Sequence, residues 1–221
     1  MEERCSSGSA GKTRQGWTAA VVIAAVLVVD QIVKYLVKTN MFLGEDIRIA
    51  EWFHIVFVEN NGMAFGMEVF GKLFLSIFRI VAIGAFVWYL CRVIGKGLPT
   101  GYVVCISFII AGAMGNLIDC IVYGQVFTES SYGTDGVAHS VPFGQGYAPM
   151  LYGKVVDMFY FPLWRWPEWV PLLGGDVFFN PVFNVADSCI TCGMIVLILF
   201  YSKYLNTGFR QSSGNNSEDE E

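Results

Sequence analysis

Charged residues are scarce in this chain: Asp, Glu, Lys and Arg make up 15% of its 221 residues, whereas 54% are hydrophobic. A soluble globular domain carries about a quarter charged residues. Apolar stretches near residues 17–37, 73–93, 102–122 and 181–204 are each long enough to cross a bilayer as a helix. The composition therefore excludes an ordinary soluble domain and predicts a multi-pass membrane protein.

Histidine is almost absent, which excludes several kinds of catalytic site. The two histidines are His54 and His139, and the chain contains neither an H-E-x-x-H nor a G-x-S-x-G motif. A zinc peptidase, or a Ser or Cys nucleophile served by a nearby His, is therefore disfavoured. Cys189 and Cys192 have redox or zinc spacing, but they stand inside an apolar stretch without a second pair or a histidine beside them. We expect neither a metal nor another cofactor.

The chain also lacks a basic stripe, so no nucleic-acid partner is expected. Residues 1–16 are small, polar and basic, and residues 206–221 end in an acidic run, so both are expected to be disordered tails. The basic start before an apolar run also suits a cleaved secretory signal. No small-x-small cleavage site ends the run, however, and hydrophobicity resumes after Lys34, which favours a retained helix.

With four spans, both termini lie on one side of the membrane. The basic residues of the N-terminal tail, of the connector near residues 92–96 and of the segment after the last span all fall on that side, which the positive-inside rule makes cytoplasmic. The loops 38–70 and 123–180 then face outward. Residues 47–60 are rich in Ile, Val, Phe and Trp and predict one or two strands that end at an Asn-Asn-Gly turn.

Polar side chains inside the apolar stretches are the main functional signal, because a charge within a membrane span is costly and usually turned into the bundle. Several of them repeat at i, i+3 or i, i+4 and so share helical faces. The topology brings them to one level near the outer boundary. They are Asp30, Lys34, Asn116, Asp119, Asn184 and Asp187, and Asp157 arrives at the same level from the outer loop.

Two carboxylates held close in a low dielectric share a proton. The ionised one can activate a water, and the protonated one can hydrogen bond to a carbonyl and later supply a proton. These residues therefore favour an aspartic peptidase acting at the membrane. An ion-coupled transporter would instead place polar residues through the full depth of the bundle. A membrane phosphotransferase would need several clustered Asp with basic partners, and a structural scaffold would not explain the buried carboxylates.

Five short motifs carry a family resemblance, and they lie between about residues 30 and 200 in the order in which the family has them. They are Asp30-Gln31-x-x-Lys34, Asn60-x-Gly62-x-Ala64-Phe65, residues 112–119 (GAMGNLID), residues 155–159 (VVDMF) and residues 183–188 (FNVADS). With these motifs the chain resembles lipoprotein signal peptidase, the signal peptidase II of bacteria.

The resemblance implies an all-α membrane protein of four transmembrane helices, over residues 17–205, with a small extracytoplasmic β-cradle supplied by residues 38–70. It implies a bacterial cytoplasmic (inner) membrane location and a catalytic dyad of Asp157 and Asp187. The implied substrate is a diacylglyceryl-modified prolipoprotein, cleaved just before its lipidated cysteine in contact with membrane lipids, and globomycin is the implied inhibitor.

The same resemblance assigns supporting positions. Asn60, Asn116 and Asn184 match residues that line the family's site, Gly62 belongs to the turn motif, and Asp30, Lys34 and Asp119 match residues that brace it.

Two features depart from the family's pattern. In most members an arginine follows the aspartate of the third-span motif, whereas this chain has Cys120, which puts any ion pair of that arginine in doubt. Arg79, within the second span, faces either the bundle or an interface. In addition, about 30 residues separate the Gly124 region from Val156, where many relatives have only a few. This insertion, within 124–156, is a lid, a partner surface or a tolerated surface loop.

Overall fold

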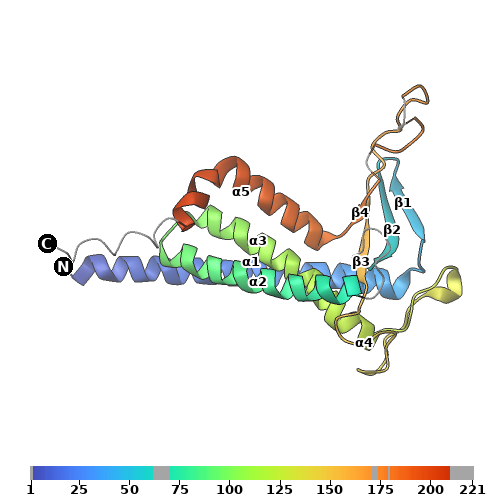
Figure 1. Ribbon diagram of the computed structural model, residues 1–221, viewed down its shortest axis with the longest axis horizontal. Coiled ribbons are helices and arrows are strands. Elements are labelled where there is room, and N and C mark those ends of the chain that lie inside the picture. The colour runs from blue at the N-terminus through green and yellow to red at the C-terminus, as the bar shows by residue number, and fades with distance from the viewer. Residues whose placement is uncertain (1, 62–69, 171–173, 179, 210–221) are drawn as a thin grey trace.

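The computed structural model describes residues 2–61, 70–170, 174–178 and 180–209. Its long helices are α1 (Glu2–Asn40), α2 (Phe70–Gly95), α3 (Thr100–Ile118) and α5 (Val185–Phe209), which run alongside one another (Figure 1). Within these described ranges, four segments are long and apolar enough to cross a membrane: Ala10–Asn40, Gly71–Gly95, Thr100–Val126 and Val185–Leu205. The predicted set of spans is therefore confirmed.

Helix α3 forms the centre of the bundle and packs against α1, α2 and α5. Its buried residues include Tyr102, Val103, Ile106 and Ile110, which form the apolar core far from the sheet. Gly112 lets α5 approach closely, because a Cβ at this position would collide with the carbonyl oxygen of Ala186. Small residues at such crossings let two helix backbones approach within a membrane.

Helix α3 does not stop where its α-helical hydrogen bonding ends. It continues as a π-helical turn over Asp119–Tyr123 and a short helix, α4 (Gly124–Val126). Single π-turns are rare and often occur at functional sites. This one places the buried carboxylate of Asp119 at the sheet end of the bundle.

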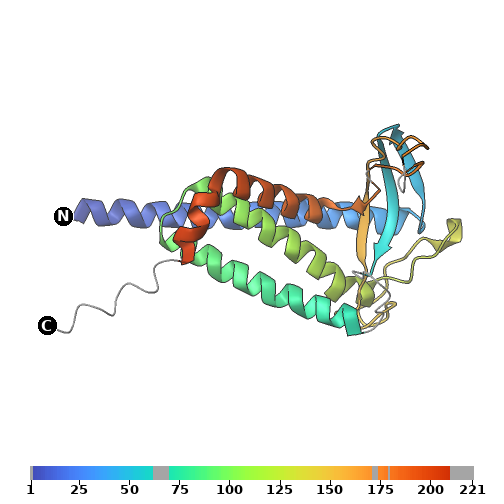
Figure 2. The same cartoon turned by 45° about the horizontal axis from the view of Figure 1, so that its top comes forward.

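A four-stranded antiparallel sheet, here called the cradle, lies at one end of the bundle (Figures 1 and 2). Its strands are β1 (Asp46–Ala50), β2 (Phe53–Asn60), β3 (Val155–Tyr160) and β4 (Val182–Phe183), in the order β1-β2-β3-β4. The beginning of α1 and the end of α5 lie at the opposite end of the bundle. The predicted strands within residues 47–60 are confirmed, but β3 and β4 join the cradle from another part of the chain.

Three boundaries differ from the sequence-based expectation. The structure continues α1 back to Glu2, whereas residues 1–16 were expected to be disordered. Extending an existing helix requires no new nucleus, so polar residues can follow an apolar helix. Helix α5 begins at Val185 rather than near Pro181, because residues 182–183 pair with β3. It also runs to Phe209, past the expected start of the C-terminal tail at residue 206; residues 210–221 lie outside the described residues.

The inserted segment after α4 packs against the bundle and the cradle. Phe127 and Tyr147 join a second apolar cluster with Val37 of α1 and with Phe57 and Met158 of the cradle. The segment contains a 3₁₀ turn over Thr134–Gly136 and a bridge between Phe127 and Ser140.

Candidate active site

Asn184 is the N-cap residue of α5 and belongs to the candidate site. Its side-chain oxygen accepts a hydrogen bond from the backbone N–H of Asp187 at 2.9 Å, and its carbonyl accepts the Ser188 N–H at 3.1 Å. An asparagine in this arrangement is a favoured N-cap, because it satisfies a first-turn N–H that has no partner within the helix. The cap therefore sets the position of Asp187 in the first turn of α5.

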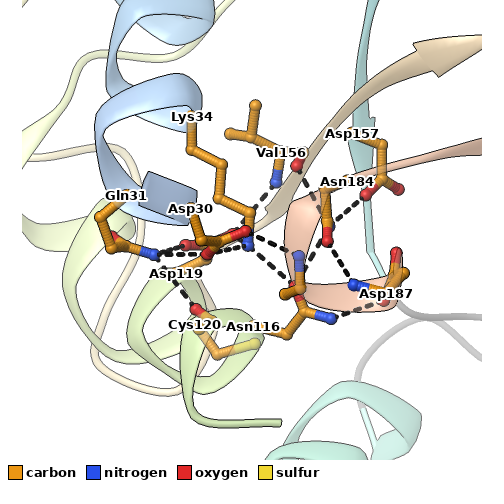
Figure 3. A network of polar contacts seen from close by, with 12 residues as sticks. Asp30, Gln31, Lys34, Asn116, Asp119, Cys120, Val156, Asp157, Asn184 and Asp187 are labelled. Atoms are coloured by element: carbon orange, nitrogen blue, oxygen red, sulfur yellow. Dashed lines mark hydrogen bonds and ion pairs between the residues drawn. The ribbon is translucent and has the colours of Figure 1, made fainter. Parts of the chain in front are cut away.

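The amide nitrogen of the same Asn184 reaches the cradle. It donates to Oδ1 of Asp157 at 2.6 Å, and the Val156 carbonyl and Asn116 Oδ1 lie 3.3 and 3.1 Å from it. Figure 3 shows Asn184 between Asp157 and Asp187. One side chain thus links the two aspartates, although β3 and α5 carry them from separate parts of the sequence.

Asn116 supplies the second contact to Asp187. Its Nδ2 donates to Asp187 Oδ1 at 2.8 Å, while its Oδ1 accepts a hydrogen bond from Lys34 Nζ at 2.8 Å. An ammonium group can only donate, so Lys34 determines which end of the Asn116 amide faces it. The N–H end is consequently directed at Asp187.

Lys34 is fully buried and lies between two carboxylates. Its Nζ is 3.0 Å from Asp30 Oδ2 and 2.8 Å from Asp119 Oδ2. Asp30 Oδ1 also accepts the backbone N–H of Ala186 at 2.9 Å, which ties α1 to the first turn of α5. Buried charges are tolerated when they are paired and their remaining hydrogen-bonding capacity is satisfied. This charged cluster therefore braces α1, α3 and α5 against one another next to the two aspartates.

Gln31, for which the sequence patterns predict no site role, completes the same cluster. Its Nε2 lies 3.1 Å from Asp30 Oδ2, 3.0 Å from Asp119 Oδ1 and 3.3 Å from the Gly115 carbonyl. The available signal was its place inside the Asp-Gln-x-x-Lys motif. The side chain reaches from α1 to α3. A contact between two helices cannot be predicted from i, i+4 spacing within one helix.

Asp157 is only 2% exposed. Burial, and after it the nearby charge of Asp187, raises the pKa of this carboxyl to about 7, against the opposing effects of hydrogen bonds from Asn60 and Asn184 and of the charge of Lys34. A carboxyl group with a pKa near neutrality can hold or release a proton under ordinary conditions. Asp187 is half-buried.

Cys120 is buried and contacts a cationic side chain from another helix. Most members of the resembled family have an arginine at this position. Arg79 Nη1 of α2 lies 3.1 Å from the Cys120 Sγ. The sequence allows Arg79 to face either the bundle or an interface, and the structure places it toward the bundle. A guanidinium group is therefore present beside residue 120, although α2 rather than α3 supplies it.

The structure thus brings eight of the nine expected site residues to the cradle end of the bundle: seven are labelled in Figure 3, and Asn60 ends β2. The ninth, Gly62, lies outside the described residues. Among the described residues, no group of three or more His, Cys, Asp or Glu side chains is arranged to hold a metal ion. The buried charged side chains of the described part include Asp30, Lys34, Lys38, Glu59, Lys72, Asp119 and Asp157. All belong to segments near the cradle, which does not suit a charged path through the full depth of the bundle.

Known proteins resemble the chain over most of its length. The family model described as signal peptidase (SPase) II matches residues 22–203. A lipoprotein signal peptidase of Porphyromonas gingivalis is 50% identical over 194 residues, which cover 86% of this chain and 84% of that protein. A lipoprotein signal peptidase of Amoebophilus asiaticus is 36% identical over 203 residues, 85% of this chain and 78% of the relative.

Two solved structures, each of a bacterial membrane enzyme, have a similar fold. Each gives a TM-score of 0.56; one is 24% identical and covers 92% of this chain and 93% of its own, and the other is 26% identical and covers 82% and 90%. The multi-pass membrane fold is therefore shared with known enzymes. The match to the family model and the 50% identical relative show that the chain belongs to the signal peptidase II family, the bacterial membrane peptidases that remove signal peptides from lipoproteins.

Proposed function

We propose that the chain is an aspartic endopeptidase in which Asp157 and Asp187 jointly activate a water molecule. The single observation that carries this proposal is the Asn184 side chain, which donates to Asp157 at 2.6 Å and caps the helix turn that holds Asp187. Two carboxyl groups held this way share one proton more easily than both ionise.

The environments of the two groups suggest their roles. The pKa of Asp157 is raised to about 7, mainly by burial, so Asp157 is the better proton holder. Asp187 is half-buried in the first turn of α5 and accepts a hydrogen bond from Asn116. A helix N-terminus favours negative charge, which suits the ionised member of the pair.

The reaction then needs no covalent intermediate. Asp187 removes a proton from water as the water oxygen attacks the peptide carbonyl, and Asp157 hydrogen bonds to the carbonyl oxygen and protonates it. As the C–N bond breaks, the proton held by Asp187 passes to the leaving amine, and Asp157 recovers its own proton when the carbonyl re-forms. Each acid and base step is of the kind that pairs of unlike carboxyl groups perform.

The proposed substrate is a prolipoprotein that carries a diacylglyceryl group on the cysteine after the cleaved bond. Asp157 belongs to β3 of the cradle and Asp187 to the first turn of α5, which begins where the helices meet the cradle (Figure 1). A lipid anchored in the bilayer would hold the scissile bond at that level before any peptide contact, which supplies proximity. Efficient cleavage of a lipid-free substrate peptide would contradict this role of the lipid, and a globomycin-type inhibitor should occupy the same site.

Orientation in the bacterial inner membrane follows from charge. Lys12 and Arg14 of α1, Arg92 and Lys96 near the end of α2, and Lys203 of α5 belong to the end of the bundle opposite the cradle. The positive-inside rule makes that end, with both termini, cytoplasmic.

Cleavage of a lipidated prolipoprotein by the purified chain tests the dyad. Asp157→Asn and Asp187→Asn should each lower the turnover number by about 10³-fold or more, as loss of a catalytic group does. Asp46→Asn is the matched control, because Asp46 is an exposed acid of β1 that pairs with His54. All variants should give the wild-type melting temperature within a few degrees, and substantial cleavage by either of the first two would reject the dyad.

A further inference from the structure

A second buried charged cluster lies beside the proposed active site. Glu59 of β2 is its acid, with a side chain only 3% exposed. Lys38 Nζ of α1 is fully buried, pairs with Glu59 Oε1 and donates to Ser130 Oγ at 2.8 Å. Lys154, which directly precedes β3, forms an ion pair with Glu59 Oε2 at 3.1 Å.

An aromatic ring and an outer acid complete this cluster. Tyr147 lies below both cations, with its ring centroid 4.9 Å from Lys38 Nζ and 5.3 Å from Lys154 Nζ. Its hydroxyl also accepts the backbone N–H of Lys154 at 2.7 Å. Glu129 contacts Lys154 Nζ at 3.1 Å from the solvent side, where its side chain is 68% exposed. Ser130, Tyr147 and Lys154 all belong to the inserted segment. The proposed dyad mechanism assigns no role to these three residues.

Strand geometry connects the cluster to the dyad. In the β2–β3 register Glu59 pairs with Val156, Asn60 with Val155 and Val58 with Asp157. Successive side chains of a strand point to opposite faces. Asn60 and Asp157 therefore share one face of the cradle, and Glu59 occupies the opposite face. The cluster therefore contacts β2 and β3 from the face opposite the active site and does not touch the two aspartates.

The cluster contacts the end of β2 and the start of β3, close to Asn60 and Asp157. Glu59 directly precedes Asn60, whose side chain hydrogen bonds to Asp157. Lys154 precedes Asp157 by three residues, so the ion pair joins the ends of β2 and β3 next to both members of that bond. Lys38 follows Lys34 by one helical turn on the same face of α1. One helix therefore contributes Lys34 to the charged cluster beside the two aspartates and Lys38 to the cluster on the opposite face of the cradle.

We infer that Glu59, held by Lys38 and by Lys154 of the inserted segment, is a positioning residue that keeps Asn60 in hydrogen-bond contact with Asp157. This inference rests on the proposed aspartic peptidase function and assigns the inserted segment a part in it. Without the two cations, the end of β2 would be held to β3 by the strand pairing alone, which leaves the Asn60 side chain freer to move away from Asp157. The Asn60 hydrogen bond favours the ionised form of Asp157, so its loss changes proton affinity at the reacting group.

The sign of a pH shift separates positioning from a simple charge effect. The groups facing Asp157 are Asp187, Lys34, Asn60 and Asn184. If Glu59→Gln weakens the cluster and Asn60 withdraws, the pKa of Asp157 should rise, and the alkaline limb of the pH–kcat profile should move to higher pH. If Glu59 acted only through its negative charge, removing that charge would lower the pKa and move the limb to lower pH.

The experiment measures kcat, KM and the pH–kcat profile of purified variants with a lipidated prolipoprotein. Glu59→Gln should lower kcat about tenfold or more with little change in KM, because the hydrogen bond from Asn60 stabilises the carboxylate that forms as Asp157 gives up its proton. Combining it with Asn60→Ala should give no further loss beyond Asn60→Ala alone, since residues acting through one contact are not additive. Glu51→Gln is the matched control, because Glu51 is a 90% exposed acid between β1 and β2.

A second variant covers the case in which Glu59→Gln does not fold. Lys154→Met removes a side chain that is 20% exposed and should show the same non-additivity with Asn60→Ala, whereas Lys154→Arg should restore kcat. Folded variants with wild-type kcat and pH profile, or additive losses in the cycle, would overturn the inference. Asp157→Asn and Asp187→Asn in the same assay keep the two questions separate, because cleavage by these variants would reject the dyad whatever the result at Glu59.

Discussion

Replacing Lys34 by methionine should strongly destabilise the helix bundle. The change keeps much of the side-chain volume but removes the ammonium that lies 3.0 Å from Asp30 Oδ2 and 2.8 Å from Asp119 Oδ2. Both carboxylates are buried and would then face each other without a cation. Removing one partner of a buried ion pair costs about 3–5 kcal/mol. In a chain of this size each kcal/mol lowers the melting temperature by about 2–4 °C, so a loss of about 6–20 °C is expected.

Thermal unfolding in detergent, followed by tryptophan fluorescence, measures this loss. Lys34→Met combined with Asp119→Asn should recover part of it, because one of the two stranded carboxylates is neutralised. Lys12→Met, at an exposed position of the same helix, should change the free energy of unfolding by no more than about 0.5 kcal/mol. A melting temperature within about 3 °C of wild type for Lys34→Met would refute the reasoning, since an exposed charge would do as much.

Three further predictions concern pH, metal ions and packing. Cleavage should fall as the pH rises through about 7, because Asp157, whose pKa burial raises to that value, then loses the proton it is proposed to donate; an activity profile flat from pH 6 to pH 8 would contradict this role. The same raised pKa means that the folded state binds this proton more tightly than the unfolded chain, so the stability it contributes is present at low pH and lost as the pH rises from about 4 to about 7. Chelation with EDTA should leave cleavage unchanged, and activity lost on chelation and restored by a divalent metal would contradict a metal-free water activation. Gly112→Ala should destabilise the chain by about 1–3 kcal/mol because its Cβ has no room beside α5, whereas Gly84→Ala, where nothing lies within 4 Å of the added Cβ, should be neutral or stabilising; equal melting temperatures would contradict this close approach.

Local patterns predicted those parts of the site that lie on single helices. Asp30 and Lys34 repeat at i, i+4 and do form an ion pair at 3.0 Å. The spans followed from apolar length alone, because a bilayer requires about 20 apolar residues in a helix. Residues 47–60 carried enough β-branched and aromatic residues to predict β1 and β2.

Contacts between distant segments could not be predicted in the same way. Lys38 and Glu59 were not singled out, because a lysine near a helix end and a glutamate in a strand are ordinary exposed residues in sequence. Only the antiparallel register of β2 and β3, together with the inserted segment, buries them as a pair. The contact of Arg79 with Cys120 likewise depends on how α2 packs against α3.

By itself the sequence determined the number of spans, the strand-forming loop and the short motifs that mark the family, because these depend on composition and on spacing within one element. The tertiary structure decided which polar groups meet. It alone joined Asp157 of β3 to the first turn of α5 through Asn184, and it alone turned the inserted segment into a support for β2. The physical reason is that a buried hydrogen bond or ion pair depends on ångström-scale approach between elements, and that approach comes from packing and strand register rather than from any local pattern.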